Sequence, residues 1–277
     1  MLGSMQDSMR QFQETVLAYY RQHGRHDLPW RAAEPNGAYD PYKILVSELM
    51  LQQTQVPRVL PKFLAFTAQF PTFEALAAAP LADVLKAWSG LGYNRRAKFL
   101  WQAARQVVSE HNGVLPRTSA ALVRLPGIGV NTAGALLAYA YNVPTIFIET
   151  NVRTVFIHHF FADQQGIDDR DILELVARTL PDDDRSWYWA LMDYGTHLKQ
   201  TVGNLNKSSK QYAVQSKFAG SKRQLRGRVL RLLAGGPQPA QAVLDALADE
   251  RAKAVLDDLY AEGMIERSNT HYKLPGA

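Results

Sequence analysis

The chain has 277 residues, of which 47% are hydrophobic, and it carries a formal net charge of +5. It contains no cysteine, which excludes disulfides, cysteine-ligated zinc and a cysteine-ligated iron–sulfur cluster. No apolar run is long enough to span a membrane and no signal peptide opens the chain, so we expect a globular, cytoplasmic protein with an anionic partner.

Most of the chain has the apolar periodicity of amphipathic helices. Apolar side chains recur every three or four positions over residues 8–23. The same periodicity predicts further helices at 58–69, 72–78, 81–88, 93–112, 150–160, 168–180 and 186–198. Alternating patterns typical of strands are scarce before the last residues, so the predicted fold class is all-α.

Residues 43–56 are apolar on most sides and predict one buried helix, yet this helix carries Glu48. An unpaired buried carboxylate is costly, so Glu48 requires either a partner or a chemical role. A position at the solvent edge, or an ion pair with Arg31 or Arg58, would explain the residue without any catalysis.

A glycine-rich corner, GLGYNRRAK, precedes the helix at 93–112 and has Tyr93 at its tip. Arg95, Arg96 and Lys98 follow directly. The tyrosine could simply pack against the fold, but an aromatic side chain on a cationic turn also suits insertion beside a nucleic-acid backbone.

The stretch from Leu125 to Val152 holds a Pro-Gly-Ile-Gly turn followed by a long apolar helix. We expect positive φ at Gly127 and Gly129, where the chain reverses. The free N–H groups of the helix that starts near Val130 would suit a phosphate oxygen, although an ordinary helical corner has the same pattern.

The charge pattern changes after the predicted helical body. Residues 195–244 contain nine lysines and arginines and no acidic residue. We predict a basic linker at 200–218, for which phosphate contact is favoured over a merely solvated loop. Residues 219–277 predict three helices and a hairpin, the order of a winged helix, which could bind either DNA or a protein.

Five segments stand in an order and spacing that resemble one protein family: LPWR, DPYKILVSELMLQQTQV, GLGYNRRAKFL, LPGIGVNTAGALLAYAY and IETNVRTVF. Over about residues 8–199 the chain resembles the helix-hairpin-helix (HhH-GPD) base-excision DNA glycosylases, above all the MutY-type adenine glycosylases, with endonuclease III as sister group. The resemblance implies a six-helix barrel at about 34–145 and a second lobe of residues 5–33 and 146–199, with the active site in the cleft between them. It implies double-stranded DNA with a mismatched or damaged base as the partner of a nucleoid-associated monomer.

The resemblance also implies roles for individual residues. Glu48 matches the acid that protonates the leaving base, and Glu149 matches the position of the family's essential aspartate. The base pocket would contain Arg31, Asn131 and Asn151. The DNA-binding residues would be Gln52, Gln53, Tyr93, Arg95, Gly127, Ile128, Gly129, Val130, Lys199, Lys207 and Lys210. A structural monovalent cation would lie at the hairpin, beside Leu125 and Gly127.

The chemistry of base excision explains why two carboxyl groups are needed. The departing base requires a proton, and a negative charge must stabilise the sugar as it gains oxocarbenium character. We expect the apolar helix to raise the pKa of Glu48, so that it keeps a proton, and the N-terminus of a helix to keep Glu149 ionised.

The sequence departs from the family pattern in three places, and these departures limit which family properties we expect in this protein. Asn131 stands where endonuclease III has its Schiff-base lysine, so we predict a monofunctional glycosylase without an efficient lyase step. Glu149 replaces an aspartate. The iron–sulfur cluster loop is missing, its first ligand position falling at Lys199. We also expect no Nudix-like C-terminal domain, since the short winged-helix-like unit follows the core instead. No cofactor is therefore expected beyond the monovalent cation.

The sequence thus predicts excision of a mispaired base, with adenine opposite 8-oxoguanine or guanine as the best single choice. Thymine or uracil in mismatches with guanine, or hypoxanthine, are the alternative substrates, and a non-catalytic DNA-binding protein is the alternative of another class. A metal-dependent nuclease is disfavoured because the adjacent His158 and His159 lack the spacing of two ligands on one helical face.

Overall fold

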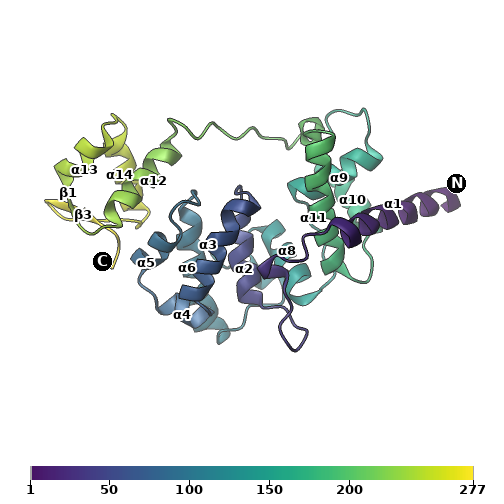
Figure 1. The fold of residues 1–277 in the computed structure, drawn as a ribbon, viewed down its shortest axis with the longest axis horizontal. Helices are drawn as coiled ribbons and strands as arrows, with labels where there is room; N and C mark the ends of the chain where they lie inside the picture. The colour runs from purple at the N-terminus through teal and green to yellow at the C-terminus, as the bar shows by residue number, and fades with distance from the viewer. Residues whose placement is uncertain (1, 277) are drawn as a thin grey trace. The chain divides into compact units, whose positions relative to one another are not determined.

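The computed structural model describes residues 2–276 and is dominated by helices (Figure 1). The helices are α1 (Leu2–His23), η1 (Pro29–Arg31), α2 (Pro41–Leu51), α3 (Val56–Gln69), α4 (Phe73–Ala78), α5 (Leu81–Ala87), α6 (Arg95–His111), α7 (Ser119–Leu122), α8 (Val130–Tyr141), α9 (Thr150–Phe160), α10 (Asp169–Arg178), α11 (Asp184–Thr201), η2 (Leu205–Ser208), α12 (Lys222–Leu233), α13 (Ala240–Leu247) and α14 (Ala252–Ala261). The strands are β1 (Gln238–Pro239), β2 (Glu266–Arg267) and β3 (His271–Lys273). None of the helices in the described part of the chain is long and apolar enough to cross a membrane.

The described elements confirm the all-α prediction but correct it in one place. Residues 43–56 were expected to form one helix, whereas α2 ends at Leu51 and α3 begins at Val56. Gln53, between the two helices, has φ of 53°, which ends helical hydrogen bonding. Pro57 then occupies the first turn of α3, where its missing N–H costs nothing.

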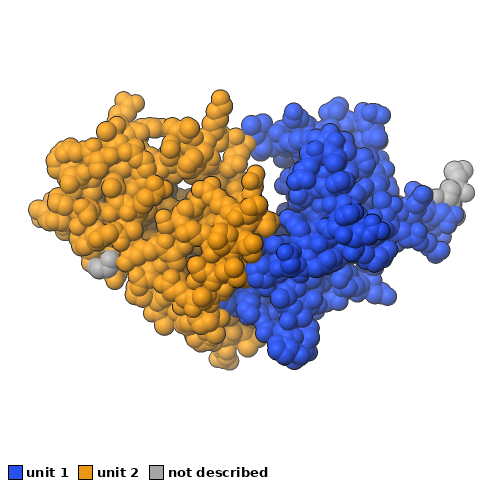
Figure 2. Space-filling model, viewed as in Figure 1, with its two compact units in different colours: residues 1–44, 117–123, 128–214 blue, residues 45–116, 124–127, 215–277 orange. Residues whose placement is uncertain are grey.

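The chain forms two compact units, each made of several segments (Figure 2). Unit 1 contains residues 1–44, 117–123 and 128–214, and unit 2 contains residues 45–116, 124–127 and 215–277. This division differs from the predicted lobes, because α8 lies in unit 1 and the C-terminal helices lie in unit 2. The predicted domain boundaries stay a prediction.

Unit 1 is built around α1, α9 and α11, which pack through aromatic side chains. Phe12 of α1 contacts Phe156 and Trp187 edge to face, with ring centroids 5.2 and 5.6 Å apart. Phe147 stacks on Tyr188 at 4.0 Å, and both side chains are fully buried. Such aromatic pairs add to the free energy gained by burying their surface, so this core fixes α9 and α11 against each other.

Unit 2 combines α3 to α6 with the C-terminal helices. Phe63, Phe66, Trp88 and Leu100 fill the core beneath α3 and α6. Helices α12, α13 and α14 surround a second core and carry a three-stranded antiparallel sheet in the order β1-β3-β2. The predicted hairpin is present, with β1 as an additional strand, while the winged-helix assignment stays a prediction.

Candidate active site and nucleic-acid interface

The Pro-Gly-Ile-Gly turn leads directly into α8. Gly127 has φ of 80°, and a Cβ there would lie 2.7 Å from the Cβ of Phe99, so both backbone conformation and close approach require glycine. Gly129 differs from our expectation, since its φ is −89°. It is the N-cap residue of α8, and a Cβ there would meet only open space. Glycine at this position therefore leaves the approach to the helix open and does not serve the turn geometry.

The first residues of α8 are open to solvent. Val130 is 71% exposed and Asn131 is exposed as well, whereas Leu125 and Ile128 are buried and anchor the turn. A ligand at this helix would thus meet the backbone N–H groups and not the side chain of Ile128. Phosphate binding here, the cation site and the place of Asn131 in a base pocket stay predictions.

Glu48 lies on α2 between residues that face the core. Ser47, Leu49 and Met50 are buried, while Glu48 itself is half-buried. The carboxyl group thus stands on an otherwise apolar helix, as the sequence indicated. Its role as the general acid stays a prediction.

Arg96, which the sequence marked only as one of three cations, holds the end of α2 in place. Its side chain is buried and its Nη1 donates to the carbonyl oxygens of Leu49, Met50 and Gln52 at 2.6, 2.9 and 2.5 Å. Nη2 donates to the carbonyl of Gly92 at 3.1 Å. One guanidinium therefore joins the helix of Glu48 to the turn that precedes Tyr93, and its burial lowers the pKa of Arg96 to about 10.

Glu149 is the N-cap residue of α9, but its side chain makes no capping hydrogen bond. Burial raises the pKa of its carboxyl group to about 7. This finding contradicts our expectation that the helix N-terminus would keep Glu149 ionised. Proximity to the helix end is not enough to keep the carboxyl group ionised. The carboxylate accepts no hydrogen bond from the N–H groups of the helix, so its desolvation outweighs the effect of the helix dipole.

The raised pKa of Glu149 predicts that the free energy of unfolding depends on pH. A carboxyl group with a pKa near 4.5 when unfolded and about 7 when folded binds more protons in the folded state. The free energy of unfolding of the wild type should therefore fall as the pH rises from about 4.5 to 7, by roughly 1–3 kcal/mol relative to Glu149→Gln. Urea unfolding at pH 5 and pH 8 measures this difference.

The control for this measurement is Glu174→Gln, at an exposed site on α10. It should follow the pH dependence of the wild type. If Glu149→Gln also follows the wild type at both pH values, the carboxyl group is not desolvated in the folded protein.

Arg31 was predicted to line the base pocket, but its terminal nitrogens bind a buried carboxylate. Its Nη1 and Nη2 donate to Asp193 at 2.8 and 3.0 Å, and Arg25 donates to the same carboxylate. The two arginines hold the pKa of Asp193 below its usual range despite burial of the group. The sequence did not mark Asp193, since 162 residues separate it from Arg31. These contacts favour a structural role for Arg31, and the base-pocket role stays a prediction.

Asn151 and Lys199, predicted for different roles, lie together in unit 1. Lys199 donates to the side-chain oxygen of Asn151 at 2.7 Å, and the amide of Asn151 donates to the carbonyl of Met192 at 3.2 Å. Gly195 makes this approach possible, because a Cβ there would lie 2.4 Å from the carbonyl oxygen of Asn151. Burial lowers the pKa of Lys199, so this lysine is a half-buried link between α9 and α11.

The residues after α11 fold back onto unit 1. The side-chain amide of Asn206 donates to the hydroxyl of Thr154 at 2.7 Å, and Ile167 forms a β-bridge with Ser209. The first part of the predicted linker is therefore packed against α9 and the segment before α10. Lys210 lies 3.7 Å from Asp168, and Lys207 lies in η2. Contact of both lysines with DNA stays a prediction.

Two non-glycine residues with positive φ meet at the Tyr93 turn: Tyr93 itself at 46°, and Gln53 at 53° in the connection between α2 and α3. The hydroxyl of Tyr93 donates to the side-chain oxygen of Gln53 at 2.7 Å, so two of the predicted DNA-binding residues are joined. Arg95, another predicted DNA-binding residue, is exposed and forms an ion pair with Glu262 at 2.5 Å. Its role in DNA binding stays a prediction.

No group of three or more histidine, aspartate or glutamate side chains that could hold a metal ion occurs in the described part of the chain. The rings of the adjacent His158 and His159 lie edge to face with centroids 4.9 Å apart, and His159 also interacts with the hydroxyl of Tyr194 at 3.3 Å. Burial lowers the pKa of His159 to about 4, so this half-buried histidine is neutral near pH 7.

Comparison with known proteins identifies the family. Residues 46–181 match the family described as "HhH-GPD superfamily base excision DNA repair protein". An adenine DNA glycosylase of Mycolicibacterium smegmatis is 37% identical over 91% of this chain and 92% of its own length. An adenine DNA glycosylase of Buchnera aphidicola is 36% identical over 61% of this chain, which spans only 46% of that relative.

A solved structure of a thermostable thymine-DNA glycosylase aligns with a TM-score of 0.59 and 25% sequence identity, covering 69% of this chain and 88% of that one. The likeness therefore extends over most of the fold and does not rest on the glycine turn alone. The chain belongs to the HhH-GPD superfamily of base excision DNA repair proteins.

Proposed function

We propose that the protein is a monofunctional DNA glycosylase that removes adenine mispaired with 8-oxoguanine or guanine. The observation that carries the proposal is the near full-length similarity to an adenine DNA glycosylase. Two acids support it, Glu48 and Glu149, to which the resemblance to the family assigns the catalytic roles. The chemistry acts on duplex DNA, from which the target base must first leave the stack.

In the proposed reaction Glu48 donates its proton to a ring nitrogen of the base. The C1′–N bond then breaks, and its electron pair leaves with the now neutral base. Positive charge develops on the sugar, and ionised Glu149 stabilises it. Water adds to C1′ and loses a proton, which leaves an abasic site. Because the pKa of Glu149 is about 7, its ionised fraction grows as the pH rises through neutrality.

Asn131 supports hydrolysis without strand cleavage. A lyase step requires an amine that attacks C1′ and forms a Schiff base, whereas the amide of Asn131 is not nucleophilic. Asn131 lies at the exposed start of α8, and the resemblance to the family matches it to the lysine of endonuclease III.

A second candidate substrate is thymine opposite guanine. The similarity to a thymine-DNA glycosylase at 25% identity and a TM-score of 0.59 supports it. The adenine relative from Mycolicibacterium covers more of the chain at higher identity, so adenine is preferred.

The proposal is tested with a panel of duplexes that each contain one mispair: adenine with 8-oxoguanine, adenine with guanine, thymine or uracil with guanine, and hypoxanthine with thymine. We expect strand breaks in the adenine duplexes only, and only after treatment with alkali, since excision alone leaves the backbone intact. Cleavage of another duplex with the adenine duplexes uncut would overturn the choice of adenine. Efficient breakage without alkali would overturn the monofunctional assignment.

A further inference from the structure

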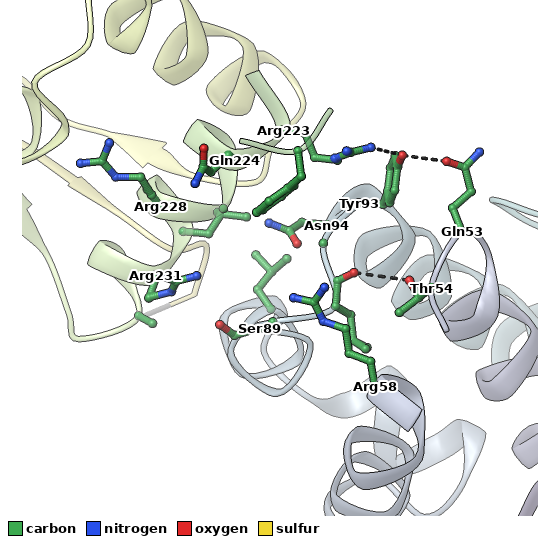
Figure 3. A pocket seen from close by; sticks show the side chains of 18 of the residues that line it. Gln53, Thr54, Arg58, Ser89, Tyr93, Asn94, Arg223, Gln224, Arg228 and Arg231 are labelled. Atoms are coloured by element: carbon green, nitrogen blue, oxygen red, sulfur yellow. Dashed lines mark hydrogen bonds between the residues drawn. The ribbon is translucent and has the colours of Figure 1, made fainter. Parts of the chain in front are cut away.

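Unit 2 contains a cavity of about 710 Å³ that belongs neither to the glycine turn nor to the helix of Glu48. It lies between the Tyr93 turn and α12, with Arg58 of α3 on one side and the arginines of α12 on the other (Figure 3). The residues that matter for its chemistry are Arg58, Tyr93, Phe218, Arg223, Arg228 and Arg231.

The lining is strongly cationic, with four arginines and no aspartate or glutamate. In the described part of the chain Arg58 and Arg231 have no ion pair, and the side chain of Arg228 donates only to the carbonyl of Ala246 at 2.9 Å. Five basic residues elsewhere in the C-terminal part are, by contrast, paired with carboxylates: Lys222, Arg226, Arg251, Arg267 and Lys273. The four arginines that line the cavity therefore form no ion pair within the described part of the chain, and Arg228 has only a Coulombic attraction to Asp249.

Arg223 of α12 contacts two aromatic rings and thereby connects α12 to the Tyr93 turn. The guanidinium of Arg223 lies 4.7 Å from the ring centroid of Tyr93 and 5.4 Å from that of Phe218. Arg223 also donates to the hydroxyl of Tyr93 (Figure 3). Gln215 donates to the same hydroxyl. The cationic wall is thereby held beside the turn that we predict to enter DNA.

The geometry favours a chain of phosphates over a single small anion. Arg223 and Arg231 are eight residues apart on one helix, a rise of about 12 Å. A DNA strand presents a phosphate about every 3.4 Å along its axis, so several phosphates fit this length. Guanidinium groups bind phosphate oxygens through two parallel hydrogen bonds, and arginine is well suited to such contacts.

We propose that this cavity binds the phosphodiester backbone of the DNA beside the Tyr93 turn and so ties the C-terminal helices to the substrate. The inference rests on the proposed function, because duplex DNA is the ligand in both. It assigns α12, and not α14, as the DNA-contacting helix of the C-terminal part.

The experiment measures the equilibrium constant for binding of the full chain to a duplex with one adenine:8-oxoguanine pair at several salt concentrations. We expect Arg58→Gln/Arg231→Gln to reduce the slope of log K against log salt by about two, since each phosphate contact contributes about 0.9. Arg58→Lys/Arg231→Lys should restore most of the slope, because the charges return. The control is Lys253→Gln, which removes an exposed charge of α14 and should leave the slope unchanged.

An unchanged slope in Arg58→Gln/Arg231→Gln, or an equal decrease in Lys253→Gln, would overturn the proposal. Titration with sodium phosphate distinguishes the source of the anion: submillimolar binding of inorganic phosphate that the double variant loses, with an unchanged DNA slope, would assign the cavity to a free anion instead.

The outcome is independent of the test of the function. If the wild type excises no base while the double variant still shows the decrease in slope, the proposed function is rejected and the cavity remains a DNA-binding site. If the wild type excises adenine while the slope of the double variant is unchanged, the proposed function is kept and the cavity is rejected as a DNA-binding site. Both arginines are exposed, so thermal unfolding of the double variant should match that of the wild type.

Discussion

Glu48→Gln should lower the rate of adenine excision by about 10²- to 10⁴-fold, the usual contribution of a general acid. The amide has nearly the shape of the protonated carboxyl group but cannot give up a proton to the leaving base. The rate is measured in a single turnover with enzyme in excess over an adenine:8-oxoguanine duplex, as strand breaks after alkali. Binding to the same duplex should change by about twofold or less, because the substitution leaves the rest of α2 in place.

Glu110→Gln is the matched control, since this exposed glutamate of α6 lies in the same unit and accepts a hydrogen bond from the neighbouring side chain of Gln106 at 2.9 Å. It should excise at the rate of the wild type. Excision by Glu48→Gln within tenfold of the wild type would show that another group supplies the proton. A loss of binding equal to the loss of excision would instead indicate that Glu48 supports the structure.

Local features of the site could be predicted from the sequence because they depend on neighbours in the chain. The turn at Gly127, the start of α8 near Val130 and the acid on the apolar helix all follow from spacing and residue type. The positive φ expected at Gly129 was wrong: its φ is −89°, and a Cβ there would meet only open space, so the backbone does not require glycine at this position.

Features that depend on distant parts of the chain could not be predicted. Asp193 becomes the partner of Arg25 and Arg31 only when α11 packs near the N-terminal segment, and no local pattern indicates this pairing. The pKa of Glu149 was misjudged for a similar reason. Its position at a helix N-terminus is visible in the sequence, whereas the desolvation that outweighs this position comes from tertiary packing.

The packed segment at the start of the predicted linker is a second feature that depends on distant parts of the chain. Composition alone made residues 200–218 a basic linker, and the charges are indeed there. Asn206, buried and bonded to Thr154, shows that part of this stretch is held in a defined conformation instead. A polar residue that anchors a loop cannot be distinguished by composition from one that is solvated.

The largest effect on stability is expected from substitution of Arg96, because its buried guanidinium donates several hydrogen bonds to backbone carbonyl groups. No pattern in the sequence indicates these bonds. Arg96→Met keeps much of the side-chain volume but leaves the carbonyl groups of Leu49, Met50 and Gly92 without this donor. Buried carbonyl groups without donors cost about 1–3 kcal/mol each, partly recovered by relaxation and water. We expect the free energy of unfolding in urea to fall by about 3–5 kcal/mol.

Arg105→Met is the matched control because it removes an arginine from the same helix, where the side chain contacts the ring of Trp101 at 4.7 Å on an exposed face. It should cost about 1 kcal/mol or less. Equal losses in the two variants would mean that the carbonyl groups around Arg96 find other donors. Arg96→Lys separates charge from geometry: one ammonium group cannot reach both the end of α2 and the Tyr93 turn, so Lys should recover only part of the stability. A full recovery would show that the positive charge, and not the fork of the guanidinium, holds these two segments together.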